Sequence, residues 1–309
     1  MSARQRVAVL ALFAAAACAG PVAAQEIELR GALKAIRDRG AIRLGYRETA
    51  PPFSFLNKAG QPVGFSLDLC RGIAADVAAR LNRELLPTDA PAWAVGLRTV
   101  LVPVSADQRL PKIAAGEIDL ECGSTTANAE RMKTVAFSPV FFLAGTKLMM
   151  RADASVGSFR ELAGRRVVAG AGTTNAAVLR RLADTTSPPV AVTEVPTLDM
   201  AYAALAAGEA DAFASDDILL YGLAATKPDG RRFRVVGDYL SYEPYAIGLP
   251  KDEPFAVLVR RSFERMAREG TMKAAYGRWF TQKLPTGETL DLPMSPHLAE
   301  MYRALGQPD

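Results

Sequence analysis

Three hydroxyl residues and an arginine directly follow a short apolar segment near the middle of this chain. The segment 118–122 ends at a glycine, the hydroxyl run begins at Ser124 and ends at Thr126, and Arg131 lies five residues further on. Hydroxyls and backbone N–H groups at a strand end can form a small anion-binding nest, and a guanidinium matches a carboxylate bidentately. The spacing therefore indicates a carboxylate site, whereas the alternative is a helix cap followed by a solvated arginine.

A glycine and two threonines form a similar arrangement later in the chain. Gly172, Thr173 and Thr174 follow a strand-like run and precede a helical pattern. Hydroxyls and N–H groups at a helix N-terminus bind anions, although an ordinary helix cap has the same sequence. Together, the two arrangements would hold the two sides of one carboxylate.

Two adjacent acids and two arginines complete the candidate site. Asp216 and Asp217 end another strand-like run, where a carboxylate would receive an ammonium group or, alternatively, cap the next helix. Arg47 and Arg109 also come just after predicted strands, and aromatic residues near Arg47 would supply apolar walls. The alternative for both arginines is an exposed position on the surface.

Strand-like and helical segments alternate along the chain, which favours an α/β architecture with parallel strands. Two segments, LPKIAAGEIDLECGS and AYAALAAGEADAFAS, share a helix, a glycine stop, a strand and a serine, and lie about 90 residues apart. Because open α/β sheets bind ligands at the carboxyl ends of their strands, this similarity predicts two lobes facing one cleft. The chain would cross between the lobes at 139–148 and 242–249. We expect strands at 41–45, 100–104, 118–122, 167–169 and 211–214, and helices at 66–81, 109–115, 173–182 and 200–207.

The N-terminus has the three parts of a secretory signal peptide. Arg4 and Arg6 supply positive charge, residues 7–17 are apolar, and small residues at 22–24 precede Gln25. The apolar run is too short to span a bilayer as a helix. We therefore expect residues 1–24 to be removed on export; the alternatives are lipid attachment at Cys18 and an uncleaved anchor.

Composition excludes several classes of function. The chain has 37 basic and 33 acidic residues, and loss of residues 1–24 leaves 35 and 33, a balance that argues against a nucleic-acid partner. With no CxxC or HxxxH pattern and one histidine, His297, the chain is expected to hold no metal and no cofactor. We expect Cys70 and Cys122 to be buried free thiols, with a disulfide as the alternative.

Longer motifs carry a family resemblance. With GYRETAPPFSF, GQPVGFSLDLC, RLPKIAAGEIDLECGSTTANAERMKTVAFS, GTTNAAVL, SDD and GRWF, the chain resembles the periplasmic solute-binding proteins of amino-acid ABC transporters over nearly its whole mature length. The nearest likeness is to members that bind glutamate and aspartate. The resemblance implies the type II periplasmic binding protein fold, with two α/β lobes joined by two hinge strands. Lobe 1 would comprise residues 25–143 and 244–309, and lobe 2 would comprise residues 144–243.

The resemblance also implies a role for each candidate residue. The α-carboxylate of an amino acid would be held by Ser124, Thr126, Arg131 and Thr174. The α-ammonium would be held by Asp216 with Ser124, or by Asp217 instead of Asp216. The ligand's side chain would be held by Arg47 and Arg109.

Two positions depart from the glutamate and aspartate binders of that family. Ala106, next to Ser105, stands where they carry a serine, and Thr197 stands where they carry a side-chain-binding histidine. The subsite for an acidic side chain has thus lost a hydroxyl and an imidazole. Glutamine, asparagine or another dicarboxylate-like ligand stays open for this reason.

A charge argument favours an acidic ligand without reference to the family. A zwitterionic amino acid needs one cationic and one anionic partner, and Arg131 and Asp216 meet that need. Arg47 and Arg109 are then surplus positive charge, and a buried charge without a partner is costly. A second carboxylate on the ligand would be their partner, which predicts glutamate or aspartate.

These observations predict a binding protein and not an enzyme. We expect a periplasmic monomer without catalytic residues, which delivers glutamate or aspartate to an ABC permease in the inner membrane. The chain itself has no GxxxxGK[ST] motif for ATP. Two alternatives share the same pocket: a ligand-sensing subunit of a membrane receptor, and a dehydratase-like enzyme. Glu48 and Glu121 are the acids nearest the predicted cleft that such an enzyme could use.

Overall fold

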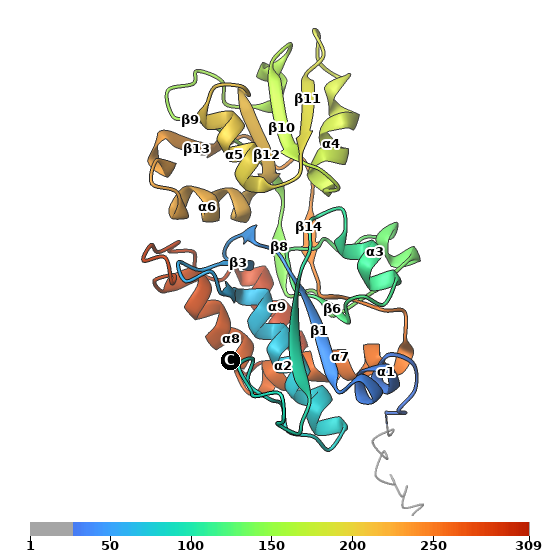
Figure 1. Ribbon diagram of the computed structural model, residues 1–309. Coiled ribbons are helices and arrows are strands. Elements are labelled where there is room, and N and C mark those ends of the chain that lie inside the picture. Colours follow the sequence, from blue (N-terminus) through green and yellow to red (C-terminus); the bar gives the residue numbers. More distant parts are fainter. Residues whose placement is uncertain (1–26, 309) are drawn as a thin grey trace, which may run out of the picture.

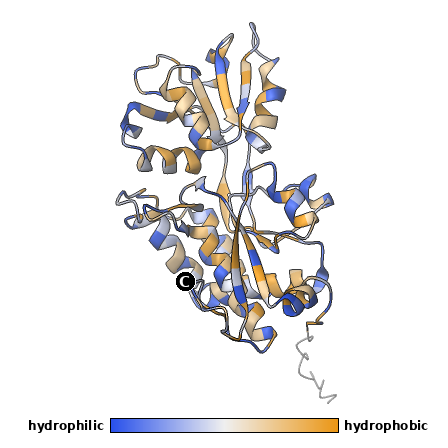
Figure 2. Ribbon diagram, in the orientation of Figure 1, coloured by the Kyte–Doolittle hydropathy of each residue, from blue (hydrophilic) through white to orange (hydrophobic). Residues whose placement is uncertain are grey.

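The chain forms two α/β lobes, each built around one five-stranded sheet (Figure 1). The computed structural model describes residues 27–308, so the predicted signal peptide, residues 1–24, lies outside the described residues. The inner strands of both sheets are mainly hydrophobic (Figure 2), in accord with their burial. Within residues 27–308, no helix has the length and apolar character needed to cross a membrane. The expected α/β architecture in two lobes is confirmed.

The sheet of lobe 1 has the strand order β5-β1-β6-β15-β7. Its strands are β1 (Ala41–Tyr46), β5 (Arg98–Pro103), β6 (Leu120–Glu121), β7 (Ala136–Phe137) and β15 (Gly248–Leu249). Strand β1 pairs in parallel with β5 and β6, whereas β15 pairs antiparallel with β6 and β7. The predicted strand 118–122 therefore contributes only two residues to the ladder.

In the described part of the chain, six α-helices belong to lobe 1. They are α1 (Gly31–Arg39), α2 (Phe65–Arg80), α3 (Arg109–Ala114), α7 (Glu253–Arg268), α8 (Thr271–Tyr276) and α9 (Pro296–Ala304). Helix α2 buries Leu69, Ile73 and Val77, which recur every four residues and so lie on one face. Three short strands, β2 (Thr49–Ala50), β3 (Ser54–Leu56) and β4 (Pro62–Val63), form a separate sheet.

A disulfide joins helix α2 to the end of strand β6. Cys70 and Cys122 are bonded, with their Cα atoms 6.1 Å apart, so the expectation of two free thiols is wrong. The pairing of Leu44 with Leu120 sets β6 beside β1, and Cys122, just beyond it, meets the buried face of α2. A cross-link over a sequence separation of 52 residues stabilises the folded state by about 4 kcal/mol in the chain-entropy model.

The sheet of lobe 2 has the order β11-β10-β12-β9-β13. Its strands are β9 (Thr146–Arg151), β10 (Arg166–Gly170), β11 (Ala191–Val195), β12 (Ala212–Asp216) and β13 (Phe233–Val236), and its helices are α4 (Thr174–Ala183), α5 (Leu198–Ala206) and α6 (Asp217–Thr226). Strand β10 pairs in parallel with β11 and β12. The helices predicted at 173–182 and 200–207 and the strands predicted at 167–169 and 211–214 are thus confirmed.

Two short strands run between the lobes and form the hinge pair (Figure 1). They are β8 (Phe142–Ala144) and β14 (Glu243–Tyr245), which pair antiparallel. Thr126 makes an isolated antiparallel bridge to Tyr245. From α9, the Tyr302 hydroxyl donates to the Phe141 carbonyl at 3.0 Å, which fastens the C-terminal helix to the hinge. The lobe boundaries at residues 143 and 244 stay a prediction.

Two glycines of lobe 2 lie directly against lobe 1. Gly172 has φ +70°, and a Cβ added there would lie 2.7 Å from the Asp107 Cα. Gly222, inside α6, faces the Pro51 carbonyl so closely that an added Cβ would clash with its oxygen. Because backbone of one lobe touches backbone of the other at both points, the two lobes are closed on each other.

Candidate functional site

A cavity between the lobes brings most of the predicted site residues together. Six of the seven line it: Arg47, Arg109, Ser124, Thr126, Thr174 and Asp216. Thr173, Asn175, Leu198, Ser215 and Leu219 complete the lining. The cavity is small: the volume open to the centre of a water-sized sphere is ≈ 10 Å³, which is about the room that one water molecule needs. An amino acid therefore reaches this cavity only when the lobes move apart.

The secondary structure explains why these residues meet. Arg47 directly follows β1, Ser124 and Thr126 follow β6, and Asp216 is the last residue of β12. Thr174 opens α4 after β10. These strands present their carboxyl ends to the cleft, which is where open α/β sheets place their ligand sites.

The arginine end of the cavity holds two buried guanidinium groups with few partners. Arg47 is 5% exposed and Arg109 is 3% exposed. Arg109 Nη1 donates to the Ser124 carbonyl at 3.3 Å, but its buried Nε has no hydrogen-bond partner among the described residues. Burial and the nearby Arg109 charge lower the pKa of Arg47 to about 10. Both side chains can therefore still bind an anion.

A buried glutamate lies behind the two arginines. Glu121 is fully buried, and its Oε2 accepts a hydrogen bond from Thr125 Oγ1 at 2.5 Å. Its Oε1 has no partner in the described part of the chain. The Glu121 charge acts on Arg47 and supports its cationic form. Glu121 and the exposed Asp107 both favour the cationic form of Arg47, so the buried groups at this end are two arginines and one glutamate.

The opposite end of the cavity is acidic. Asp216 accepts hydrogen bonds from Asn175 Nδ2, at 2.7 Å, and from the Tyr245 hydroxyl. Burial and the negative charge of Glu243 raise the pKa of Asp216 to about 7. Asp217, the alternative ammonium ligand, instead accepts from the Ile218 N–H at 2.8 Å and does not line the cavity. The geometry therefore favours Asp216 as the partner of an ammonium group.

Glu243, on the hinge strand β14, is a site residue that the sequence reasoning missed. It is 2% exposed, and its Oε2 accepts hydrogen bonds from Thr126 Oγ1 and Thr174 Oγ1, both at 2.6 Å. The two threonines lie 117 and 69 positions away in the sequence. The one available signal was an acid inside the predicted crossing at 242–249.

Arg131 is the one predicted site residue that does not line the cavity. Its Nη1 donates to the Thr126 carbonyl at 2.9 Å, so the guanidinium lies directly behind a cavity residue. Burial and the Arg109 charge lower the pKa of Arg131 to about 10, although Glu243 acts in the opposite direction. In this closed arrangement Arg131 lies behind Thr126, and its positive charge acts on the site from there.

The two positions that depart from the family pattern have structural roles here. Ala106 is buried beside the turn that leads to Arg109. Thr197 caps α5, since its hydroxyl accepts a hydrogen bond from the Met200 N–H at 3.1 Å. The next residue, Leu198, lines the cavity together with Leu219. The wall that lobe 2 contributes therefore contains two leucines, which sequence reasoning did not single out.

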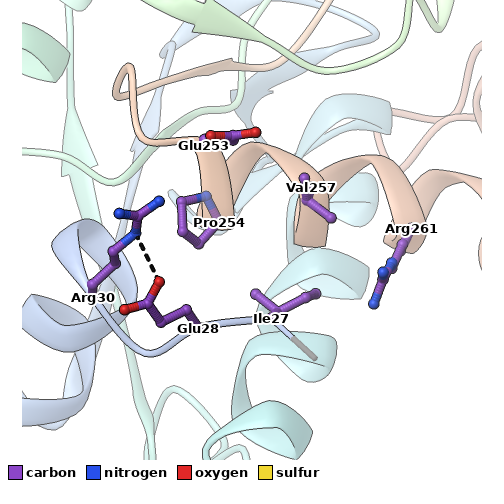
Figure 3. A pocket seen from close by; sticks show the side chains of 7 residues that line it. All are labelled: Ile27, Glu28, Arg30, Glu253, Pro254, Val257 and Arg261. Atoms are coloured by element: carbon purple, nitrogen blue, oxygen red, sulfur yellow. Dashed lines mark ion pairs between the residues drawn. The ribbon is translucent and has the colours of Figure 1, made fainter. Parts of the chain in front are cut away.

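Roomier hollows lie outside the cleft, and two of them show how they differ from the cavity. One, of ≈ 170 Å³, is bordered by Ile27, Pro254 and Val257, and its ion pair between Arg30 and Glu28 is exposed (Figure 3). The other, of ≈ 450 Å³, lies beside Tyr239 and Tyr242. By contrast, three of the six buried polar atoms without a partner in the described chain lie at the cleft cavity or just behind it: Arg109 Nε, Glu121 Oε1 and Ser215 Oγ. Because buried polar groups without a partner are rare and six of the seven predicted site residues line this cavity, the small cavity is the candidate site.

Within residues 27–308, no group of three or more His, Cys, Asp or Glu side chains is placed to hold a metal ion. The polar groups at the cavity are cations at one end and carboxylates at the other. Such an arrangement suits a ligand that carries both charges. It needs no metal to bridge ligand and protein.

Comparisons with known proteins identify the family of the chain. Residues 42–282 match the model of the bacterial extracellular solute-binding proteins, family 3. The chain is 35% identical over 292 residues to the L-glutamate/L-aspartate-binding protein of Pseudomonas aeruginosa, which covers 93% of this chain and 92% of that protein. It is 32% identical to the glutamine-binding protein of Geobacillus stearothermophilus, over 71% of this chain and 76% of the relative. An ancestral arginine-binding protein solved with arginine has a TM-score of 0.68 at 27% identity, over 78% of this chain and 99% of that one.

Proposed function

The chain belongs to the bacterial extracellular solute-binding proteins of family 3, and from this premise we propose that it binds glutamate or aspartate between its lobes. The bound amino acid would be delivered to an ABC-type permease of the inner membrane. The expected place of action is the periplasm, and the expected form is a monomer. The names of similar proteins include three different kinds of amino acid. The choice of an acidic ligand therefore rests on the cavity.

Two buried arginines with few hydrogen-bond partners are the observation that carries this proposal. Arg47 and Arg109 are buried at the cavity, and of the two carboxylates that act on Arg47 only Glu121 is buried, whereas Asp107 is exposed to solvent. A buried cation is stable only when it is paired and hydrogen-bonded. A side-chain carboxylate on the ligand supplies the missing charge, whereas the amide of glutamine does not.

The opposite end supports recognition of the amino-acid group. Asp216 offers a buried carboxylate to the ammonium. The N–H groups at the start of α4, with Ser124 and Arg131 from lobe 1, are the partners proposed for the α-carboxylate. Because these groups come from both lobes, a ligand that contacts all of them stabilises the closed form.

A thermal-shift screen tests the ligand. The mature chain, residues 25–309, is unfolded and refolded to remove bound ligand and is then heated with each of the twenty amino acids and with dicarboxylates. A ligand at about a thousand times its Kd adds roughly 4 kcal/mol to the free energy of unfolding, which raises the Tm by several degrees. Glutamate and aspartate should shift the melt, and neutral amino acids should not. A shift with glutamine alone would contradict the acidic ligand and leave the fold assignment intact.

A neutral polar ligand such as glutamine is the second candidate. Leu198 and Leu219 line the cavity on the lobe 2 side, and the hydroxyl of Thr197 is occupied in capping α5. The two leucines and the capping hydroxyl of Thr197 offer no hydrogen bond to a second carboxylate oxygen. Within the described residues the cavity offers no histidine or free thiol for catalysis, so a dehydratase-like reaction has weaker support than binding. A receptor-linked sensor would use the same cavity and differ only in its membrane partner.

A further inference from the structure

Glu243 occupies a position in the site that no assigned role explains. It lies on β14 of the hinge pair and not on either sheet. One carboxylate oxygen accepts from Thr126 of lobe 1 and from Thr174 of lobe 2, and the other accepts from Ser241 Oγ. The carboxylate is therefore buried with three hydroxyl donors, two of which line the ligand cavity.

These bonds fix which way the two threonine hydroxyls point. A hydroxyl has one proton to donate and two lone pairs to accept with. Thr126 and Thr174 both donate to Glu243 Oε2 at 2.6 Å, so neither proton is left for the cavity. Their oxygens lie 3.4 Å apart and can present only lone pairs to a ligand. A carboxylate gains nothing from such a surface, whereas an ammonium group has three N–H donors for it.

The charge at this end works in the same direction. The Glu243 carboxylate acts on Asp216 through space and, together with burial, raises the Asp216 pKa. Two carboxylates already share this region, with Arg131 as the nearby cation. A further carboxylate that enters without a positive charge beside it meets like-charge repulsion in a buried site.

Building on the proposed amino-acid function, we propose that Glu243 is a positioning residue that makes the site select for an amine. It turns the hydroxyls of Thr126 and Thr174 into acceptors, and with Asp216 it excludes dicarboxylates that lack an amino group. The two threonines then lie beside the ammonium of the ligand, and not beside its α-carboxylate as the family resemblance implies. The α-carboxylate is left to Ser124, Arg131 and the N–H groups at the start of α4.

The test compares ligands that differ only in the amine. Glutarate has the carbon chain and both carboxylates of glutamate without the amino group, and succinate relates to aspartate in the same way. Calorimetry gives the Kd of each ligand for the wild-type chain and for Glu243→Gln, which keeps the shape of the side chain but removes its negative charge. Glu209→Gln, at an exposed position of lobe 2, is the matched control.

The wild-type protein should prefer glutamate to glutarate by at least about 100-fold, the order expected when a buried charged partner is lost. Glu243→Gln should weaken glutamate binding and narrow that preference by about tenfold or more, and Glu209→Gln should change neither quantity. Equal losses for glutamate and glutarate in Glu243→Gln, which leave the preference unchanged, would mean a purely structural role and overturn the proposal. Unchanged affinities for both ligands would overturn it as well.

A second variant keeps the test informative if Glu243→Gln does not fold. Thr174→Val removes one of the two hydroxyls that Glu243 orients and should narrow the preference in the same direction, by a smaller factor. The ligand proposal fails separately, if the wild-type chain prefers glutamine to glutamate. Glu243 is then tested with glutamine and its analogue without the amine, and the same narrowing is expected. A wild-type chain that binds glutarate as tightly as glutamate contradicts selection for the amine by both Glu243 and Asp216, and it leaves the binding of an acidic ligand intact.

Discussion

The two ends of the cavity differ in how their charged groups are satisfied. At the acidic end, both oxygens of Asp216 and both oxygens of Glu243 accept hydrogen bonds from the protein. At the arginine end, the buried Nε of Arg109 and Oε1 of Glu121 have no partner in the described chain. The acidic end is preorganised before a ligand arrives, whereas the arginine end is completed only by one.

This difference separates two tasks that a binding site must perform. The preorganised end recognises the group that all amino acids share, and its hydrogen bonds hold it in one geometry. The incomplete end distinguishes one side chain from another, because an unpaired buried charge penalises a ligand that leaves it unpaired. Substitutions at the two ends should therefore give different patterns across a ligand panel.

The largest effect is expected at the acidic end. Asp216→Asn removes the buried charge that pairs with the ligand's ammonium and should weaken every amino acid by about 100-fold or more. Asp217→Asn is the matched control, because the carboxylate of Asp217 is next to Asp216 in the sequence but lies outside the cavity. Calorimetry with glutamate and glutamine measures both variants. A loss confined to glutamate would contradict the division between the two ends.

The arginine end should give a selective loss. Arg109→Met removes one cation and should weaken glutamate roughly tenfold to 100-fold more than glutamine, because a hydrogen bond to a charged group contributes about 1.5–3 kcal/mol. Arg160→Met, at an exposed position of lobe 2, should leave both affinities unchanged. Equal weakening of glutamate and glutamine by Arg109→Met would remove the argument for an acidic ligand.

Acid should weaken binding through the acidic end. The Asp216 pKa is raised to about 7 by burial and by Glu243, while Asn175 and Tyr245 donate to it and Asp217 also repels its charge. An ammonium needs the ionised carboxylate, so affinity is full above pH 7 and falls about tenfold per pH unit as pH drops below 7. The side-chain carboxylate of glutamate stays ionised to about pH 5. Calorimetry between pH 5.5 and 8 measures this slope, and an affinity that rises in acid would contradict it.

The smallest effect on affinity should be the same for all ligands, because it arises at the contact between the lobes and not at either end of the cavity. Gly222→Ala places a methyl group against the Pro51 carbonyl when the lobes close. By lowering the closed fraction it should weaken all ligands by roughly threefold to tenfold. Alanine favours a helix by about 1 kcal/mol over glycine, so the Tm of the free protein should not fall. Gly157→Ala, with open space around it, is the control and should change no affinity.

Local patterns in the sequence were sufficient to predict the residues that follow strands. Arg47, Ser124, Thr126 and Asp216 each come just after an apolar run, and parallel strands bring such positions to one edge. Thr174 is the first residue of α4, and the preceding Thr173 is a typical N-cap residue that marks the start of a helix in the sequence. These residues meet because the fold repeats one simple unit in each lobe.

The residues that sequence reasoning missed depend on contacts between distant segments. The crossing at 242–249 was predicted, but the contact of Glu243 with Thr126 and Thr174 depends on how β14 packs between the two lobes. The charge argument from sequence counts only Arg131, Asp216, Arg47 and Arg109, and the effect of Glu121 on Arg47 depends on how the chain packs behind the arginines. The disulfide was missed for a related reason: the meeting of Cys70 and Cys122 depends on how α2 packs over β6.

The most direct test of the account is a crystal structure of the mature chain with its bound amino acid. The account predicts an acidic ligand with its ammonium within hydrogen-bond distance of Asp216 and its side-chain carboxylate between Arg47 and Arg109. A ligand whose side chain lies against Leu198 and Leu219, with both guanidinium groups paired only to protein atoms, would contradict it.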